Sequence, residues 1–156
     1  MDEQYDLELV LRFIALRYSD RSALRLYPDM ETILTERALE LARDPGFDRD
    51  GVMTSFRETF DVLWSVGPDV FRRYDDQRGR SVGAFSVSAY EAVTQGVSNN
   101  LQAWMEVPVP EREERLLIRI SELWSDAEFR ANSGGGVRPT QRIPFMSAVG
   151  SRVFVP

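Results

Sequence analysis

The first strong pattern along the chain is the stretch from Leu7 to Tyr18, in which apolar residues cover most of a helix's circumference. Only Glu8, Arg12 and Arg17 interrupt this pattern. A helix on the surface of a domain usually shows one apolar stripe, so the stretch predicts a central helix that other segments cover. Asp6 is its predicted N-cap. Glu8 and Arg12 stand one turn apart, a spacing that predicts an ion pair along the same side of the helix.

Further segments repeat their apolar residues with the period of a helix. A second helix is expected to begin near Pro28 or Asp29, because proline suits a first turn. A third ends at Gly67-Pro68, and a fifth begins at Pro110. The positions expected to face the core are Met30, Ile33, Leu34, Ala38, Leu41 and Ala42 in the second helix, Val52, Phe56, Thr59, Phe60, Leu63 and Trp64 in the third, and Leu116, Leu117, Ile120, Leu123 and Trp124 in the fifth.

The fourth predicted helix begins in the sequence Ser88-Ala89-Tyr90-Glu91. This sequence matches a capping box, with Ser88 as the N-cap and Glu91 three residues later. Gly96 lies inside the same helix. A glycine in the middle of a helix costs about 1 kcal/mol relative to alanine, so Gly96 predicts either a close crossing by another backbone or a bend.

These patterns predict an all-α fold, a bundle of about five or six helices packed around the N-terminal helix, without a substantial sheet. Residues 1–131 are expected to form the bundle, residues 132–138 a glycine-rich linker, and residues 139–156 a C-terminal helix and tail of the same domain. The linker lacks the Gly-Lys-Ser/Thr ending and the preceding strand of a phosphate-binding loop.

Composition removes several kinds of active site. The 156 residues include neither Cys nor His, which excludes disulfides, thiolate nucleophiles, imidazole triads and zinc fingers. The adjacent pairs Asp75-Asp76 and Glu113-Glu114 are poor Mg²⁺ ligands because neighbouring side chains diverge, so we expect no metal, no cofactor and no catalytic residue. An acidic N-terminus and the lack of an apolar run of ~20 residues predict a cytoplasmic protein that does not enter a membrane.

A formal net charge of -6 argues against general binding to nucleic acid. Two segments are nevertheless locally basic: residues 68–83, which are predicted to form a loop, and residues 129–156, which contain four Arg and no acidic residue. Arginine matches phosphate oxygens and stacks on planar rings. The candidate residues for contact with nucleic acid or a partner are Arg72, Arg73, Tyr74, Arg78, Arg80, Arg138 and Arg142. The alternative is a solvated loop with local ion pairs.

Several short passages also follow one another in a distinctive order. They are Leu9-Val10-Leu11-Arg12-Phe13-Ile14-Ala15, then Val62 to Phe71, then Phe85 to Val93 with Gly96, and finally Thr140-Gln141-Arg142-Ile143 with Ala148 and Phe154. Together they resemble the helical C-terminal half of the GmrSD-type restriction-enzyme family. Members of that family carry, ahead of this region, a ParB-like and sulfiredoxin-like α/β portion with an Asp-Gly-Gln-Gln-Arg motif, associated with nucleotide hydrolysis and cleavage of modified or foreign DNA.

The Asp-Gly-Gln-Gln-Arg motif does not occur in this chain. The resemblance therefore implies a non-catalytic helical module that supports or docks a ParB-like nuclease or NTPase partner in a phage-defence or DNA-restriction system. DNA would then be reached only through that complex. The alternatives are a module that binds DNA directly and an antitoxin-like adaptor unrelated to a nuclease.

Overall fold

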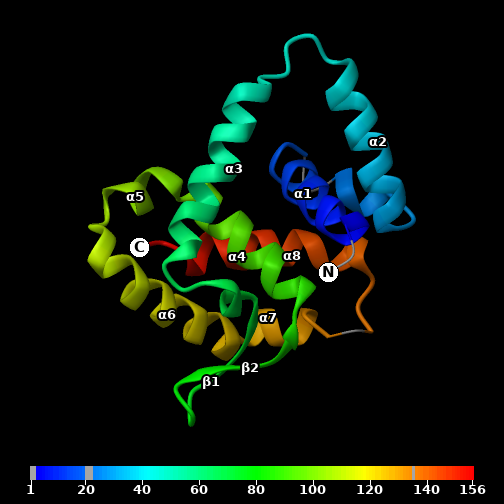
Figure 1. The fold of residues 1–156 in the computed structure, drawn as a ribbon. Helices are drawn as coiled ribbons and strands as arrows, with labels where there is room; N and C mark the ends of the chain where they lie inside the picture. Colours follow the sequence, from blue (N-terminus) through cyan, green and yellow to red (C-terminus); the bar gives the residue numbers. More distant parts are fainter. Residues whose placement is uncertain (1–2, 20–22, 135) are drawn as a thin grey trace.

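The computed structural model describes residues 3–19, 23–134 and 136–156 (Figure 1). Most of these residues are helical, as predicted. The elements follow in the order α1 (Glu3–Arg17), η1 (Ala23–Leu26), α2 (Met30–Arg43), α3 (Arg49–Trp64), η2 (Pro68–Phe71), β1 (Arg72–Asp75), β2 (Arg80–Phe85), α4 (Val87–Asn99), α5 (Leu101–Glu106), α6 (Val109–Ser125), α7 (Ala127–Asn132) and α8 (Pro139–Val153), where η denotes a 3-10 helix. The helix count exceeds the prediction because the fourth predicted helix ends at Asn99 and continues as α5, and because α7 had not been predicted.

The centre of the molecule is α4, which α8 crosses (Figure 1). Every residue from Ser88 to Ser98 is buried. In α1, by contrast, Phe13 and Leu16 lie in the interior, whereas Leu7 is 64% exposed and Leu11 is 40% exposed. The prediction that the N-terminal helix is the central one is therefore wrong, because one apolar side of α1 has no covering element among the described residues.

Two glycines allow α4 and α8 to cross closely. A Cβ atom on Gly96 would lie 2.4 Å from the carbonyl oxygen of Gly150, and one on Gly150 would lie 2.0 Å from the carbonyl oxygen of Ala92. Such distances are too short for any Cβ contact. The close backbone crossing is thus one of the two alternatives predicted for Gly96, and α4 continues through the glycine without interruption.

Side-chain caps define where several helices begin. The Asp29 carboxylate accepts a hydrogen bond from the backbone N–H of Thr32 at 2.8 Å, and α2 begins at the next residue, as predicted. Because α1 begins at Glu3, Asp6 lies inside the helix and the prediction that it is the N-cap is wrong.

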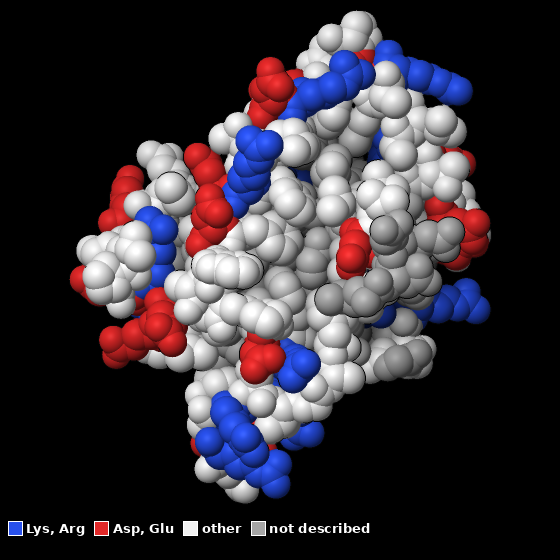
Figure 2. Space-filling view, in the orientation of Figure 1, with Lys and Arg blue, Asp and Glu red and all other residues white. Residues whose placement is uncertain are grey.

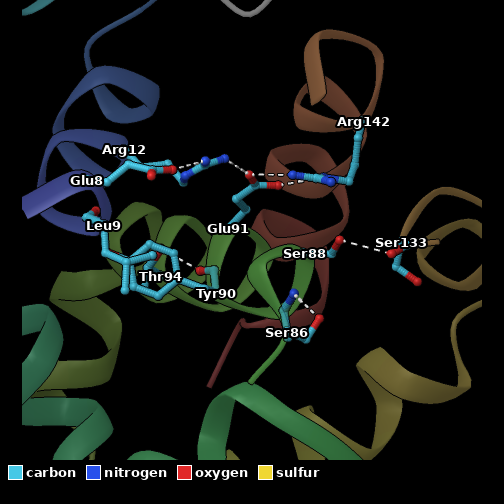
Figure 3. Close-up of polar contacts among 11 residues, drawn as sticks. Glu8, Leu9, Arg12, Ser86, Ser88, Tyr90, Glu91, Thr94, Ser133 and Arg142 are labelled. Carbon is cyan, nitrogen blue, oxygen red and sulfur yellow. Dashed lines mark hydrogen bonds and ion pairs between the residues drawn. The ribbon is translucent and has the colours of Figure 1, made fainter. Parts of the chain in front are cut away.

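The predicted capping box of α4 is also wrong, by two residues. Ser86 is the N-cap, and its hydroxyl accepts a hydrogen bond from the backbone N–H of Ala89 at 3.2 Å. Ser88 lies inside the helix and donates a hydrogen bond to the carbonyl oxygen of Ser133 (Figure 3). Glu91 is therefore free of a capping role.

Residues 72–85 form a β-hairpin, although residues 68–83 had been predicted as a loop. Strand β1 pairs antiparallel with β2, and Asp75 is opposite Arg80 at the end of the ladder. Gly79 and Gly83 have φ values of 60° and 81°, a conformation that glycine adopts without steric cost. The hairpin extends from the helical body beside α6 and α7 (Figure 1).

Some predicted core positions lie at the surface. Trp64, at the end of α3, is 81% exposed. Ala42 is exposed, and Ala38 and Leu41 are only half-buried. The predictions that placed these residues in the core are wrong. The three residues from α2 instead line an open groove, described below.

Candidate functional site

A buried ion cluster joins α1, α4 and α8 (Figure 3). Its centre is Glu91, whose side chain is 1% exposed. The Oε1 atom of Glu91 accepts hydrogen bonds from Arg12 at 2.6 Å and from Arg142 at 2.9 Å, and Oε2 accepts a second bond from Arg142 at 2.9 Å. Arg12 also pairs with Glu8 one turn earlier, as the spacing predicted.

The charges in this cluster stabilise one another. Burial by itself lowers the pKa of Arg12, but the negative charge of Glu91 and the hydrogen bonds to Glu8 and Glu91 outweigh burial, so the pKa of Arg12 is raised. Both carboxylate oxygens of Glu91 are already occupied by guanidinium donors. This geometry suits a link between helices and does not leave a carboxylate free for general-base catalysis.

Two other polar side chains of α4 attach the backbone of α1. The Tyr90 hydroxyl donates a hydrogen bond to the carbonyl oxygen of Leu9 at 2.7 Å, and the Gln95 amide donates one to the carbonyl oxygen of Phe13 at 3.1 Å. Burial raises the pKa of Tyr90. These bonds satisfy two of the polar side chains that α4 buries.

The residues predicted to bind nucleic acid or a partner lie in three separate places. Arg72, Arg73, Tyr74, Arg78 and Arg80 are on the hairpin. Arg138 is exposed ahead of α8. Arg142 is buried and paired with Glu91, so its guanidinium belongs to the interior and not to a surface site.

The hairpin concentrates positive charge on an acidic molecule. Figure 2 shows the arginine side chains gathered at the lower edge, where Figure 1 places the hairpin. Arg72 pairs with Asp69 at 3.3 Å, and Arg78 pairs with Asp75 at 3.7 Å. Among the described residues, neither Arg73 nor Arg80 has an ion pair.

A polar hollow of about 740 Å³ lies between the hairpin and the junction of α6 and α7. We call it the hairpin hollow. It is lined by Arg73, Tyr74, Asp75, Asp76, Gln77, Trp124, Ser125, Arg130 and Ser133. Arg73 from the hairpin and Arg130 from the basic segment after residue 129 therefore line the same hollow. Sequence reasoning had not selected Arg130 as a site residue, although the excess of arginine after residue 129 was visible, and it had placed Trp124 in the core.

An apolar groove of about 340 Å³ opens between α1, α2 and α3. We call it the α1–α3 groove. It is lined by Leu11, Ile14, Ala38, Leu41, Ala42, Phe47, Arg49, Val52 and Met53. Arg49 is its one charged lining residue, and that side chain donates a hydrogen bond to the carbonyl oxygen of Ala42 at 3.3 Å. Periodicity identified most of these side chains as apolar but could not show that they remain uncovered.

The part of the chain that the structure describes has no cluster of three or more acidic side chains suited to a metal ion. None of the described helices combines the length and apolar character needed to cross a bilayer.

Comparison of the chain with protein-family models, with curated proteins and with solved structures finds no match. The resemblance to the GmrSD-type family thus stays a prediction, and the candidate sites are defined by geometry alone. The fold and these sites describe a mainly helical protein with an internal ion cluster, an open apolar groove and a basic hairpin.

Proposed function

We propose that this chain is a non-catalytic helical module that docks a ParB-like nuclease or NTPase partner in a phage-defence or DNA-restriction system. The observation that carries the proposal is the α1–α3 groove. Its lining is almost entirely apolar, yet Leu11 is 40% exposed and Met53 is 47% exposed. Exposed apolar side chains that lie together in a groove can form part of a protein–protein contact.

The arrangement of α1 supports docking at this groove. Helices α2 and α3 diverge as an open V, and α1 lies between its arms (Figure 1). Leu11 and Ile14 face the groove, whereas Phe13 and Leu16 of the same helix are in the core. A helix with apolar residues on both sides removes them from water only when both sides are covered. A docked partner would cover the second side of α1.

The ParB-like class of partner comes from the family resemblance. Leu11 and Ile14 belong to the passage Leu9–Ala15 that resembles the family, and both line the groove. In family members, the catalytic α/β portion precedes this helical region. A separate ParB-like domain would then meet the helical module at its first helix, where the groove lies.

The acidic residues of the hairpin support a non-catalytic role. Asp75 accepts hydrogen bonds from the backbone N–H groups of Gln77 and Arg78, and Asp76 accepts one from the Ser121 hydroxyl. One oxygen of each carboxylate is hydrogen-bonded within the protein, and the described residues hold no group of three or more acidic side chains that could bind a metal ion.

Co-expression with the protein encoded immediately upstream, followed by gel filtration, tests the proposal. That protein should carry the Asp-Gly-Gln-Gln-Arg motif and elute together with this chain. The double variant Leu11→Asp/Met53→Asp should elute separately, because it places two carboxylates in the groove. Ile118→Asp is the matched control, since Ile118 is 49% exposed on α6 and lies outside the groove.

Co-elution of the groove variant with the ParB-like protein would contradict docking at this surface. A complex with an adjacent toxin, in place of a ParB-like protein, would support the antitoxin-like alternative. Circular dichroism of both variants should match that of the wild-type chain, which separates a lost interface from a lost fold.

A further inference from the structure

We propose that the hairpin hollow binds a nucleotide unit, a phosphate with its attached base, either as a free nucleotide or within a single strand. Two arginines that have no ion pair or hydrogen bond among the described residues line the same hollow as two aromatic side chains, and this juxtaposition carries the inference. The site is separate from the α1–α3 groove and requires no docked partner. It therefore goes beyond the proposed function and stands independently of it.

The lining holds two arginines and two aspartates, so its formal charge is balanced, and what favours an anion is the set of hydrogen-bond donors left free there. Both aspartates are engaged: Asp75 accepts two backbone N–H groups at 3.1 and 3.2 Å, and Asp76 accepts the Ser121 hydroxyl at 2.6 Å. The side chains of Arg73 and Arg130 have neither an ion pair nor a hydrogen bond among the described residues. The donors left for a ligand are therefore mainly cationic.

Arginine at both sides of a hollow suits phosphate in particular. A guanidinium presents five N–H donors in a fixed fork that matches phosphate oxygens. Arg73 comes from β1 and Arg130 from α7, so two elements distant in sequence contribute one donor group each. Both side chains are exposed, and a ligand can reach them without displacing a partner from the part of the chain that the structure describes.

The aromatic part of the lining suits a base. Tyr74 and Trp124 are half-buried and line the same hollow. The Trp124 ring packs edge-on against Phe129, with ring centroids 5.0 Å apart and an interplanar angle of 88°, which fixes the orientation of the indole. Bases stack on aromatic side chains with little dependence on sequence. A volume of about 740 Å³ also falls within the ~300–1,000 Å³ typical of small-molecule sites.

Binding of a fluorescently labelled oligo-dA strand, followed by anisotropy in low salt, tests the site. Arg73→Ala/Arg130→Ala should weaken binding at least tenfold. The matched control is Arg43→Ala/Arg57→Ala, which removes the same charge from exposed arginines of α2 and α3 that have no ion pair among the described residues. The control should change affinity less than twofold.

Competition identifies the form of the ligand. Displacement of the strand by ATP would show that a free nucleotide fits the site, whereas displacement only by an unlabelled strand would assign the site to single-stranded nucleic acid. In a Trp64→Phe background, the bound ligand should also change the fluorescence of Trp124, because Trp104 is buried and already hydrogen-bonded.

Three results would overturn the inference. An equal loss of affinity for the strand in the two double variants would show that binding depends only on the net charge of the protein. Competition by inorganic phosphate as strong as that by ATP would show that the base makes no contact. A duplex that binds as tightly as the single strand would likewise indicate backbone contact alone. The Leu11→Asp/Met53→Asp variant should bind the strand normally, so failure of the docking proposal and failure of this inference are distinguishable.

Discussion

At the scale of single residues, the carboxylate of Glu91 has the largest effect on the interior. It pairs with Arg12 from α1 and Arg142 from α8, while Glu8 supplies the second negative charge, and almost none of the Glu91 side chain reaches solvent. Removing one member of a buried ion cluster leaves the remaining charge without compensation, which costs more than the net stabilisation that the intact cluster provides.

Glu91→Ala should lower the free energy of unfolding by about 3 to 5 kcal/mol, because it leaves two buried guanidinium groups without their shared partner. Arg12→Ala should cost less, on the order of 1 to 3 kcal/mol, because Glu91 keeps both bonds to Arg142. Urea unfolding measures both values.

Glu40→Ala provides the control for the Glu91 variant. Glu40 pairs with Arg37 on the surface of α2, and its side chain is 56% exposed. Its removal should cost only about 0 to 1 kcal/mol. Similar losses for the Glu91 and Glu40 variants would contradict the central role assigned to the buried cluster.

Asp126 links stability to pH. Burial raises the pKa of Asp126, but hydrogen bonds from the Phe129 N–H and from Arg152, together with the charge of Arg152, outweigh burial and lower it. The unfolded chain therefore binds a proton more readily than the folded chain at this position. The stabilisation by the Asp126 carboxylate is complete above the pKa of an aspartate in the unfolded chain, which is about 3.9. It is lost as the pH falls through the lower pKa that Asp126 has in the folded chain.

Asp126→Ala should reduce stability at pH 7 by roughly 0.5 to 2 kcal/mol, because the variant loses the N-cap of α7. The difference from wild type should shrink as the pH is lowered below about 4. Urea unfolding of both proteins at pH 7, 4 and 3 measures the trend. A difference that stays constant over this range would show that the carboxylate charge contributes nothing.

At the scale of elements, the crossing of α4 and α8 depends on backbone contact. Gly96→Ala should destabilise the protein by about 1 to 3 kcal/mol, because the added methyl group would overlap the Gly150 carbonyl and force the helices apart. This cost opposes a gain of about 1 kcal/mol from helix propensity. Thermal unfolding measures the net change.

Gly134→Ala is the control for the crossing, since a Cβ atom there would meet nothing within 4 Å. It should leave the melting temperature close to that of wild type. A Gly96→Ala variant that melted at or above the wild-type temperature would show that the two helices separate easily.

The ends of elements were predictable where one local contact decides them. The predicted start of α2 near Pro28 or Asp29 is confirmed to within two residues, although Asp29 caps the helix and Pro28 lies ahead of it and not in its first turn. For α4, both Ser86 and Ser88 could serve as caps, and the glutamate three residues after Ser88 favoured the wrong serine. Glu91 is instead bound to residues 79 and 51 positions away, and such contacts leave no trace in local sequence.

The hairpin was missed for a related reason. Charged residues dominate β1 and the turn, so the alternation of apolar and polar residues that identifies a strand is weak. The strands are held by pairing with each other and by packing beside α6. The presence of Arg73 and Arg130 in one hollow depends on this packing and could not be predicted from either segment alone.

At the scale of the whole molecule, α8 belongs to the core. Ile143, Met146 and Val149 are fully buried, and the Trp104 indole donates a hydrogen bond to the Phe154 carbonyl at 2.8 Å. Removing residues 139–156 should therefore abolish cooperative thermal unfolding of the entire chain, and not merely lower its melting temperature.

Replacing residues 76–79 with Asn-Gly provides the contrast, because it shortens the hairpin turn and removes the exposed hydrogen bond between Asp76 and Ser121 without changing a core residue. Asn-Gly suits a two-residue turn. This variant should keep a sharp transition within about 4 °C of wild type. A cooperative transition in the chain without α8 would show that the remaining helices can form a core by themselves.

The ion cluster also has a consequence for synthesis of the chain. Arg142 follows Glu91 by 51 residues, and ribosomes add ~5–20 residues per second, so the two residues are made roughly 3 to 10 s apart. During that interval Glu91 has only Arg12 to neutralise it, and the side of α4 that α8 covers remains open to water. The nascent chain is therefore more prone to aggregation before α8 emerges than after it.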